Sequence, residues 1–184
     1  MLTLTFLVKT LIELYVMVLL IRIWMQWARC DFYNPFAQFI VKVTQPVVGP
    51  LRRVLPSIGP IDTSSLLVAF ILTTLKFPIL LLIQSGGLSL DPFNLVIGVL
   101  SLLKSAGTMV FWVIIIRSLM SWISQGRSPI EYVLMQMTEP MMAPIRRILP
   151  AMGGLDFSAM VVILILYALN YLGMDLFPGL WYAI

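Results

Sequence analysis

Residues 45–56 read QPVVGPLRRVLP and residues 139–150 read EPMMAPIRRILP. Each of these Pro-rich segments lies between two long apolar runs, and a shift of 94 residues (45 + 94 = 139) places the first segment on the second. Self-similarity at a fixed spacing indicates an internal repeat, which constrains the fold more strongly than any single motif. The sequence therefore predicts two copies of one unit, each with a basic Pro-rich segment between two apolar segments.

The correspondence between the copies extends beyond these segments. The shift of 94 also aligns Pro35 with Pro129, Thr44 with Thr138 and Asp62 with Asp156. Upstream the shift becomes 95, which aligns Arg22 with Arg117, Met25 with Met120 and Trp27 with Trp122. One residue was therefore gained or lost in the loop between Trp27 and Pro35.

The composition is that of an integral membrane protein. Of 184 residues, 60% are hydrophobic and only 11% are charged, which is more apolar surface than a soluble domain of this size buries. The apolar run from Met1 is longer than the apolar core of a signal peptide, so we expect it to remain as the first span. The chain has a single cysteine and no histidine, so an internal disulfide and imidazole chemistry are excluded. We expect no enzymatic activity, no metal and no cofactor.

Four segments are long and apolar enough to cross a bilayer, which takes roughly 20 apolar residues. They are about residues 3–27, 62–83, 105–123 and 156–177. Residues 93–123 would be about 46 Å long as one helix, so we expect a bend or an interfacial extension before Gly107. The predicted fold is an all-α membrane protein with four transmembrane helices in two parallel repeats. Repeat 1 covers residues 1–84, repeat 2 covers residues 93–184, and residues 85–92 form an outward-facing turn.

An amphipathic helix is predicted at the start of each Pro-rich element. Asn34 is the expected N-cap of the first, and Ser128 and Glu131 form an expected capping box in the second. Such helices either lie along a membrane surface or cover the bundle. We expect the prolines at 46, 50, 56 and 60 to break the first helix into a tight turn and about one further helical turn.

The charges predict the orientation. Nine of the twelve Lys and Arg residues fall in or beside the two repeated loops, at positions 22, 29, 42, 52, 53, 117, 127, 146 and 147. The positive-inside rule then places both loops in the cytoplasm and both termini outside, in the periplasm of a bacterial inner membrane. Trp181 and Tyr182 are expected to anchor the outer interface.

Basic residues of the repeated elements are candidates for binding. Paired guanidinium groups recognise phosphate well, so the candidate lipid- or partner-binding residues are Lys42, Arg52, Arg53, Arg146 and Arg147. The alternative is that these charges only set the topology.

Other charged residues fall within or beside the apolar segments. Arg22 with Asp62, and Arg117 with Asp156, stand near the same interface and are predicted to pair within each repeat, the alternative being separate solvation. By helical rise, Glu13 and Lys76 lie at similar depths and their side chains can meet. With Asn170, they are candidates either for an ion or proton path or for a packing contact, and Glu13 has Lys9 as an alternative local partner.

The repeated pattern of a span, a Pro-rich LRRVLP or IRRILP loop, a Gly-x-x-Asp sequence and a second span resembles the YggT family of bacterial membrane proteins, which is YlmG-like in Gram-positives and plastids. The resemblance covers nearly the whole chain. It implies a four-span inner-membrane protein without known catalysis. It also implies links to osmotic-stress tolerance and, in plastid or cyanobacterial relatives, to cofactor assembly or nucleoid organisation.

We therefore expect a non-enzymatic accessory or scaffold protein that contributes to osmotic-stress tolerance. Its expected partners are anionic lipid head groups, a membrane-protein complex and further copies of itself, and not nucleic acid. The competing hypothesis is a small ion channel or transporter, for example for potassium, that uses polar groups between the repeats.

Overall fold

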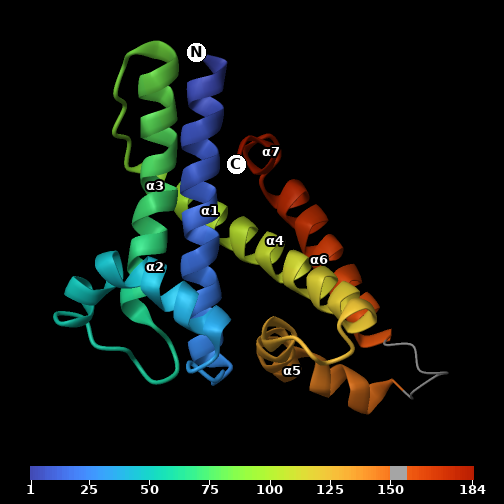
Figure 1. The fold of residues 1–184 in the computed structure, drawn as a ribbon. Coiled ribbons are helices and arrows are strands. Elements are labelled where there is room, and N and C mark those ends of the chain that lie inside the picture. The colour runs from blue at the N-terminus through green and yellow to red at the C-terminus, as the bar shows by residue number, and fades with distance from the viewer. Residues whose placement is uncertain (150–156) are drawn as a thin grey trace.

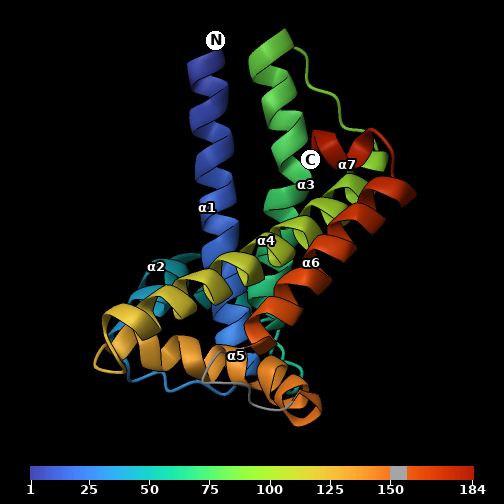
Figure 2. The ribbon, with the colours of Figure 1, turned by 90° about the vertical axis from the view of Figure 1, so that its right-hand side faces the viewer.

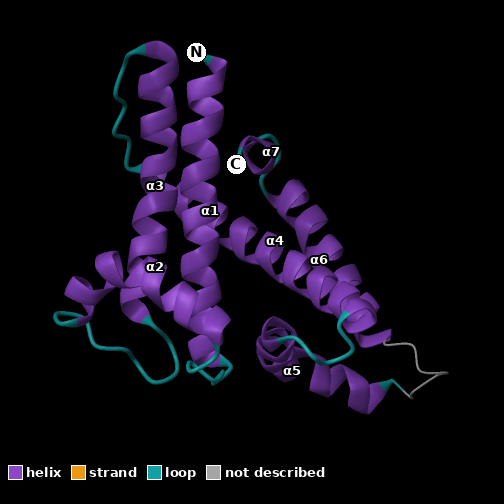
Figure 3. Ribbon diagram, viewed as in Figure 1, coloured by secondary structure: helices purple, strands orange, loops and turns teal. Residues whose placement is uncertain are grey.

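The computed structural model describes residues 1–149 and 157–184, and in this part of the chain every named element is a helix (Figure 3). The helices are α1 (Leu2–Trp27), α2 (Pro35–Arg52), α3 (Thr63–Ser85), α4 (Phe93–Ile123), α5 (Pro129–Ile148), α6 (Phe157–Leu176) and α7 (Leu180–Ala183). The predicted all-α class is confirmed.

Four of these helices, α1, α3, α4 and α6, are long and apolar enough to cross a membrane. Helices α1 and α3 run side by side, and α4 and α6 run at a marked tilt to them (Figure 1). Many large apolar side chains on these helices are exposed, such as Leu11, Leu103 and Leu164. Exposed apolar surface of this extent is typical of helices that contact lipid.

Helix α4 differs from the expectation of a break before Gly107. It is one continuous helix of 31 residues from Phe93 to Ile123. A hydrophobic helix longer than the bilayer is thick can tilt instead of bending. The tilt of α4 relative to α1 and α3 is plain in Figure 2.

Helix α2 also differs from the expectation, because it does not end at its first proline, and α5 likewise continues past its internal prolines. Helix α2 continues through Pro46 and Pro50, and α5 continues through Pro140 and Pro144. An internal proline removes one backbone hydrogen bond and clashes with the carbonyl four residues before it, so it bends a helix without always ending it. Helix α5 changes direction along its length (Figures 1 and 2).

The two helix starts are built differently. The Asn34 side chain caps α2 by accepting a hydrogen bond from the Phe36 amide at 3.0 Å, as predicted. The predicted capping box of α5 is wrong, because the Ser128 side chain makes no cap hydrogen bond. The Glu131 carboxylate instead turns back to the preceding loop, where it accepts hydrogen bonds from the Gly126 amide at 2.8 Å and from the Ser124 hydroxyl.

The two Pro-rich helices share four buried positions of the repeat, and α5 buries Val133 and Met137 in addition. The buried residues of α2 are Ala37, Ile40, Thr44 and Val48. Their counterparts at a shift of 94 are all buried in α5, namely Glu131, Leu134, Thr138 and Met142. Helices α2 and α5 lie at one end of the molecule, and the N-terminus and the α3–α4 turn lie at the other (Figure 1).

Candidate functional sites

A buried charge cluster joins α1, α2 and α3 at the α2 end of the molecule. Arg22 of α1 is only 3% exposed, and its Nε lies 3.3 Å from Oδ2 of Asp62, which is fully buried. The two terminal nitrogens of Arg22 donate to Thr44 Oγ1 at 2.7 Å and to Gln45 Oε1 at 3.1 Å. Every nitrogen of the guanidinium group therefore has an acceptor, which burial of a charge requires.

Asp62 has a double role in this cluster. Its carboxylate caps α3 by accepting hydrogen bonds from the Ser65 amide at 3.3 Å and from the Ser65 hydroxyl at 2.8 Å. Arg52 approaches the same carboxylate at 3.9 Å and also donates to Gln26 and Ser57. Arg52 thus contacts the buried cluster although its side chain is 39% exposed, and the cluster ties three helices together.

In the second repeat, the corresponding partner Asp156 lies outside the described residues, so the predicted Arg117–Asp156 pair stays a prediction. Arg117 donates a hydrogen bond to Met142 Sδ at 3.3 Å. Arg146, the counterpart of Arg52, forms an exposed ion pair with Glu139 at 3.2 Å. Exposed ion pairs of this kind contribute little to stability.

The second arginine of each repeated pair is placed differently from the first. Arg53 and Arg147 are exposed, and within the described part of the chain neither makes an ion pair or a side-chain hydrogen bond. Lys42 of α2 is also exposed. All four repeated arginines are exposed, and they divide into two that form ion pairs within the protein and two that do not.

A second charge pair, between buried Lys76 and half-buried Glu13, lies within the span region. Lys76 of α3 is 2% exposed, and its Nζ lies 3.3 Å from Glu13 Oε1 of α1 and 3.1 Å from Ser101 Oγ of α4. The local pair of Glu13 with Lys9 that was the alternative does not form; Glu13 bonds across to α3 instead. This contact joins three spans through one ammonium group.

Asn170 does not join Glu13 and Lys76. Its side-chain oxygen accepts a hydrogen bond from Trp181 Nε1 at 2.9 Å, and Lys104 Nζ donates to the Trp181 backbone carbonyl at 2.7 Å. Trp181, expected to anchor the outer interface, is 8% exposed and packs its ring against Gly173. The three polar groups that were candidates for a shared path therefore form two separate sites.

A groove of about 560 Å³ lies between α4, α6 and α7, beside Asn170. Its lining is mainly apolar, with Phe111, Tyr167 and Trp181 among the aromatic residues and Lys104 at its rim. Such a lining suits an acyl chain.

Cys30 lies in the α1–α2 loop and is 6% exposed. Burial raises the pKa of the Cys30 thiol to about 11. The thiol is therefore protonated at neutral pH and unsuited to act as a nucleophile.

Sequence reasoning did not assign Thr44, Gln45, Ser101 or Trp181 a place in these sites. Thr44 carried a usable signal, because a threonine recurs at position 138 within an otherwise apolar helix face. Ser101 carried none, since a single serine in an apolar span is common.

Comparison with known proteins gives a consistent family assignment. The sequence profile of the CCB3/YggT family matches residues 1–83 and 96–177. The uncharacterized protein YggT of Escherichia coli K12 is 56% identical over 190 residues, with 99% of each chain covered. A Vibrio alginolyticus protein named for its place in the proC 3′ region is 55% identical over 183 residues, and the alignment covers 99% of each chain. A Pseudomonas aeruginosa protein is 34% identical over 169 residues, covering 91% of this chain and 86% of its own. No solved structure matches the chain significantly.

Proposed function

The chain belongs to the CCB3/YggT family, and from this membership and the placement of its charges we propose that it is a non-enzymatic accessory or scaffold protein of the bacterial inner membrane. Its two repeats are inserted in parallel, with α2 and α5 in the cytoplasm and both termini in the periplasm. The exposed basic residues of α2, α5 and their connecting loops contact anionic lipid head groups, which hold both helices at the membrane surface. From this position they are available to a partner membrane complex.

The observation that carries this proposal is the division of the charges into two groups. Buried Arg22 and Lys76 are neutralised by carboxylates within the chain. Arg53 and Arg147 are exposed and keep their charge available at the end where α2 and α5 lie. Each basic side chain near an anionic leaflet contributes about 1 kcal/mol of attraction. Positive charge at one end also favours the cytoplasmic side for that end.

Lipid titration tests the proposal. In neutral detergent, the melting temperature of the wild-type protein is expected to rise when phosphatidylglycerol is added, and to rise less with phosphatidylcholine. The double variant Arg53→Gln, Arg147→Gln is expected to lose part of the phosphatidylglycerol effect, because two of the exposed charges at this end are gone while others, such as Lys42, remain. High salt should reduce the wild-type effect by screening the same charges.

A charge-retaining control separates electrostatic binding from damage to the fold. Arg53→Lys, Arg147→Lys keeps both charges and is expected to respond to phosphatidylglycerol almost as the wild type does. A glutamine variant that responded fully to the anionic lipid would show that these arginines do not contact head groups.

A contribution to osmotic-stress tolerance is the cellular part of the proposal. Cells lacking the gene are expected to grow more slowly at high osmolarity and to be restored by the wild-type chain. Restoration by the Arg53→Gln, Arg147→Gln variant to the wild-type level would separate any osmotic role from lipid contact.

Ion transport is the second candidate function, and the buried contact of Glu13, Lys76 and Ser101 is the observation that favours it. Ionisable groups within a membrane often mark an ion or proton path. Here the ammonium is held by a carboxylate and a hydroxyl, and Asn170 is bonded elsewhere, so the geometry favours a packing contact.

Proteoliposome measurements distinguish the two roles of this contact. Glu13→Gln is expected to lower the melting temperature and leave cation flux unchanged, because it leaves the buried Lys76 ammonium without its carboxylate partner. The double variant Glu13→Gln, Lys76→Met should recover part of the lost stability, since no unpaired charge remains. A selective flux in the wild type that Glu13→Gln or the single variant Lys76→Met abolished would instead favour transport.

A further inference from the structure

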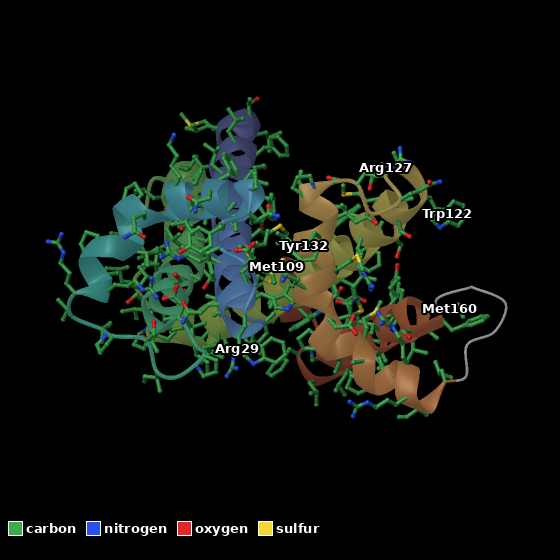
Figure 4. All side chains as sticks on the ribbon, turned by 60° about the horizontal axis from the view of Figure 1, so that its bottom comes forward. Arg29, Met109, Trp122, Arg127, Tyr132 and Met160 are labelled. Carbon is green, nitrogen blue, oxygen red and sulfur yellow. The ribbon has the colours of Figure 1, made fainter. Side chains whose placement is uncertain are left out.

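The two repeats contact each other through an interface at the α2–α5 end of the molecule. The Asn34 side chain donates a hydrogen bond to the Pro129 carbonyl at 2.8 Å, and the Asp31 amide donates to Gln136 Oε1 at 3.2 Å. Val133 and Met137 of α5 are fully buried there and belong to the same apolar cluster as Met25, Cys30 and Ala37 of repeat 1. Figure 4 views this end and places Tyr132 and Met109 where the two halves meet.

This interface joins two different faces of the repeat. We call the first the junction face; in repeat 1 it is the end of α1 and the loop into α2, with Met25, Cys30, Asp31 and Asn34. We call the second the helix face; in repeat 2 it is one side of α5, with Pro129, Val133, Gln136 and Met137. Each repeat carries both faces in its sequence, so the contact within one chain uses only half of them.

The helix face of repeat 1 is uncovered. Subtracting 94 from the α5 positions gives Pro35, Phe39, Lys42 and Val43 of α2. Whereas Val133 and Met137 are fully buried, their counterparts Phe39 and Val43 are 59% and 36% exposed. A shallow hollow on this side of α2 is lined by Pro35, Phe39 and Lys42 among others.

The junction face of repeat 2 is uncovered as well. It consists of the end of α4 and the loop of residues 124–128, and it includes Trp122 and Ile123, which are 82% and 83% exposed. At the shift of 95, Trp122 aligns with Trp27, which is 46% exposed. Leu119, which is 57% exposed, aligns with Trp24, which is 7% exposed. In Figure 4 Trp122 projects from the outer edge of the repeat 2 half, away from repeat 1.

We propose that a second copy of this chain covers these faces by placing the junction face of its repeat 2 on the helix face of α2, which repeats between chains the interface that exists within one chain. The contact is heterologous, because two different faces meet and each copy keeps one face free for a further copy. Both faces lie at the same end of the molecule, so neighbouring copies have the same orientation in the membrane (Figure 1). Such contacts form a ring if the rotation closes and an open row if it does not. The proposal does not depend on lipid binding by Arg53 and Arg147.

Paired cysteines in native membranes test this contact. Asp31 and Gln136 meet within one chain, and their counterparts across the proposed contact are Gln125 and Lys42. In a Cys30→Ala background, a short bismaleimide is expected to shift most of the Lys42→Cys, Gln125→Cys protein to dimers and larger species. Each single variant is expected to remain monomeric. In a heterologous contact, position 42 of one chain does not lie next to position 42 of another chain, and the same holds for position 125. Co-expression of the two single variants should give dimers and no larger species.

Two further variants serve as controls. Asp31→Cys, Gln136→Cys should crosslink within one chain and remain monomeric, which shows that the interface is intact and the reagent spans it. Lys42→Cys, Leu169→Cys pairs the α2 position with an exposed residue of α6 and should stay monomeric.

The proposal fails if the Lys42→Cys, Gln125→Cys protein stays monomeric while the internal pair reacts, in which case lipid covers both faces. It also fails if the single variants crosslink as strongly as the double variant, since that would indicate a symmetric contact. Equal crosslinking of the Leu169→Cys control would show random collision and would overturn the proposal too.

Discussion

Arg22 and Asp62 stabilise the first repeat because each depends on the other for burial. The arginine is 3% exposed and the aspartate is fully buried, so removing the carboxylate leaves a positive charge with only neutral acceptors. Breaking one side of a buried pair costs roughly 3 kcal/mol or more. Asp62→Asn is expected to lower the unfolding free energy by about this amount, measured by thermal or denaturant unfolding in detergent.

Asp91→Asn is the matched control for that substitution. Asp91 is exposed in the α3–α4 turn, where its side chain accepts a hydrogen bond from the Phe93 amide, a bond that asparagine can keep. A change of less than about 0.5 kcal/mol is expected there. If Asp62→Asn proved as mild as Asp91→Asn, the Arg22–Asp62 contact would not hold the helices together.

Cys30 gives a second prediction for a single residue. Because its thiol is buried and its pKa is about 11, maleimide alkylation at pH 7 is expected to be slow in the folded protein and fast after unfolding. The alkylation rate should also rise with pH towards 11 as the thiolate forms. Rapid labelling of the folded protein at pH 7, measured by mass spectrometry, would contradict the buried position.

Among the elements, α3 and α4 make a close contact that only glycine permits. A Cβ atom at Gly98 would lie 3.0 Å from Thr74 Cα, and the backbone cannot easily move away. Gly98→Ala is therefore expected to push the helices apart and lower stability by about 1–3 kcal/mol. The melting temperature in detergent measures this effect.

Gly107→Ala is the control within the same helix. No atom lies within 4 Å of a Cβ at that position, so alanine should be neutral or should stabilise α4 by up to about 1 kcal/mol. Equal effects at both positions would show that α4 does not pack closely on α3 at Gly98.

The sequence predicted the existence of the helices better than their continuity. Apolar runs mark α1, α3 and α6 because a span must be apolar throughout its length, and these helices begin and end within a few residues of the predicted bounds. The path of α4 and the course of α2 through Pro46 and Pro50 depend on tilt and bending, which are set by packing against other helices. The periodicity of apolar residues carries no information on the tilt or the bending of a helix.

The candidate site residues likewise divide into those whose contacts the sequence could predict and those whose contacts it could not. The partners of Arg22 and Lys76 were accessible to sequence reasoning, because a charge in an apolar span needs an opposite charge at the same depth. The separation of Asn170 from Glu13 was not, since it depends on α7 returning Trp181 to α6. Nor could the repeat show that Arg52 forms bonds within the protein whereas Arg53 does not, because both copies have the same two arginines.

For the whole molecule, the account depends on two repeats inserted in the same direction. Helices α2 and α5 then lie on the same side of the membrane. On that side the exposed basic residues are available to lipid head groups, whereas the buried charges are paired within the protein. The uncovered faces of α2 and of the α4–α5 junction also lie on one side only under this arrangement.

Labelling of cysteines placed at positions 53 and 147 tests this arrangement most directly. In a Cys30→Ala background, Arg53→Cys and Arg147→Cys are each compared in intact cells and in inverted membrane vesicles with a maleimide that cannot cross the bilayer. The account predicts that both sites are protected in intact cells and labelled in inverted vesicles. Labelling of one site from outside and the other from inside would contradict it and indicate repeats inserted in opposite directions.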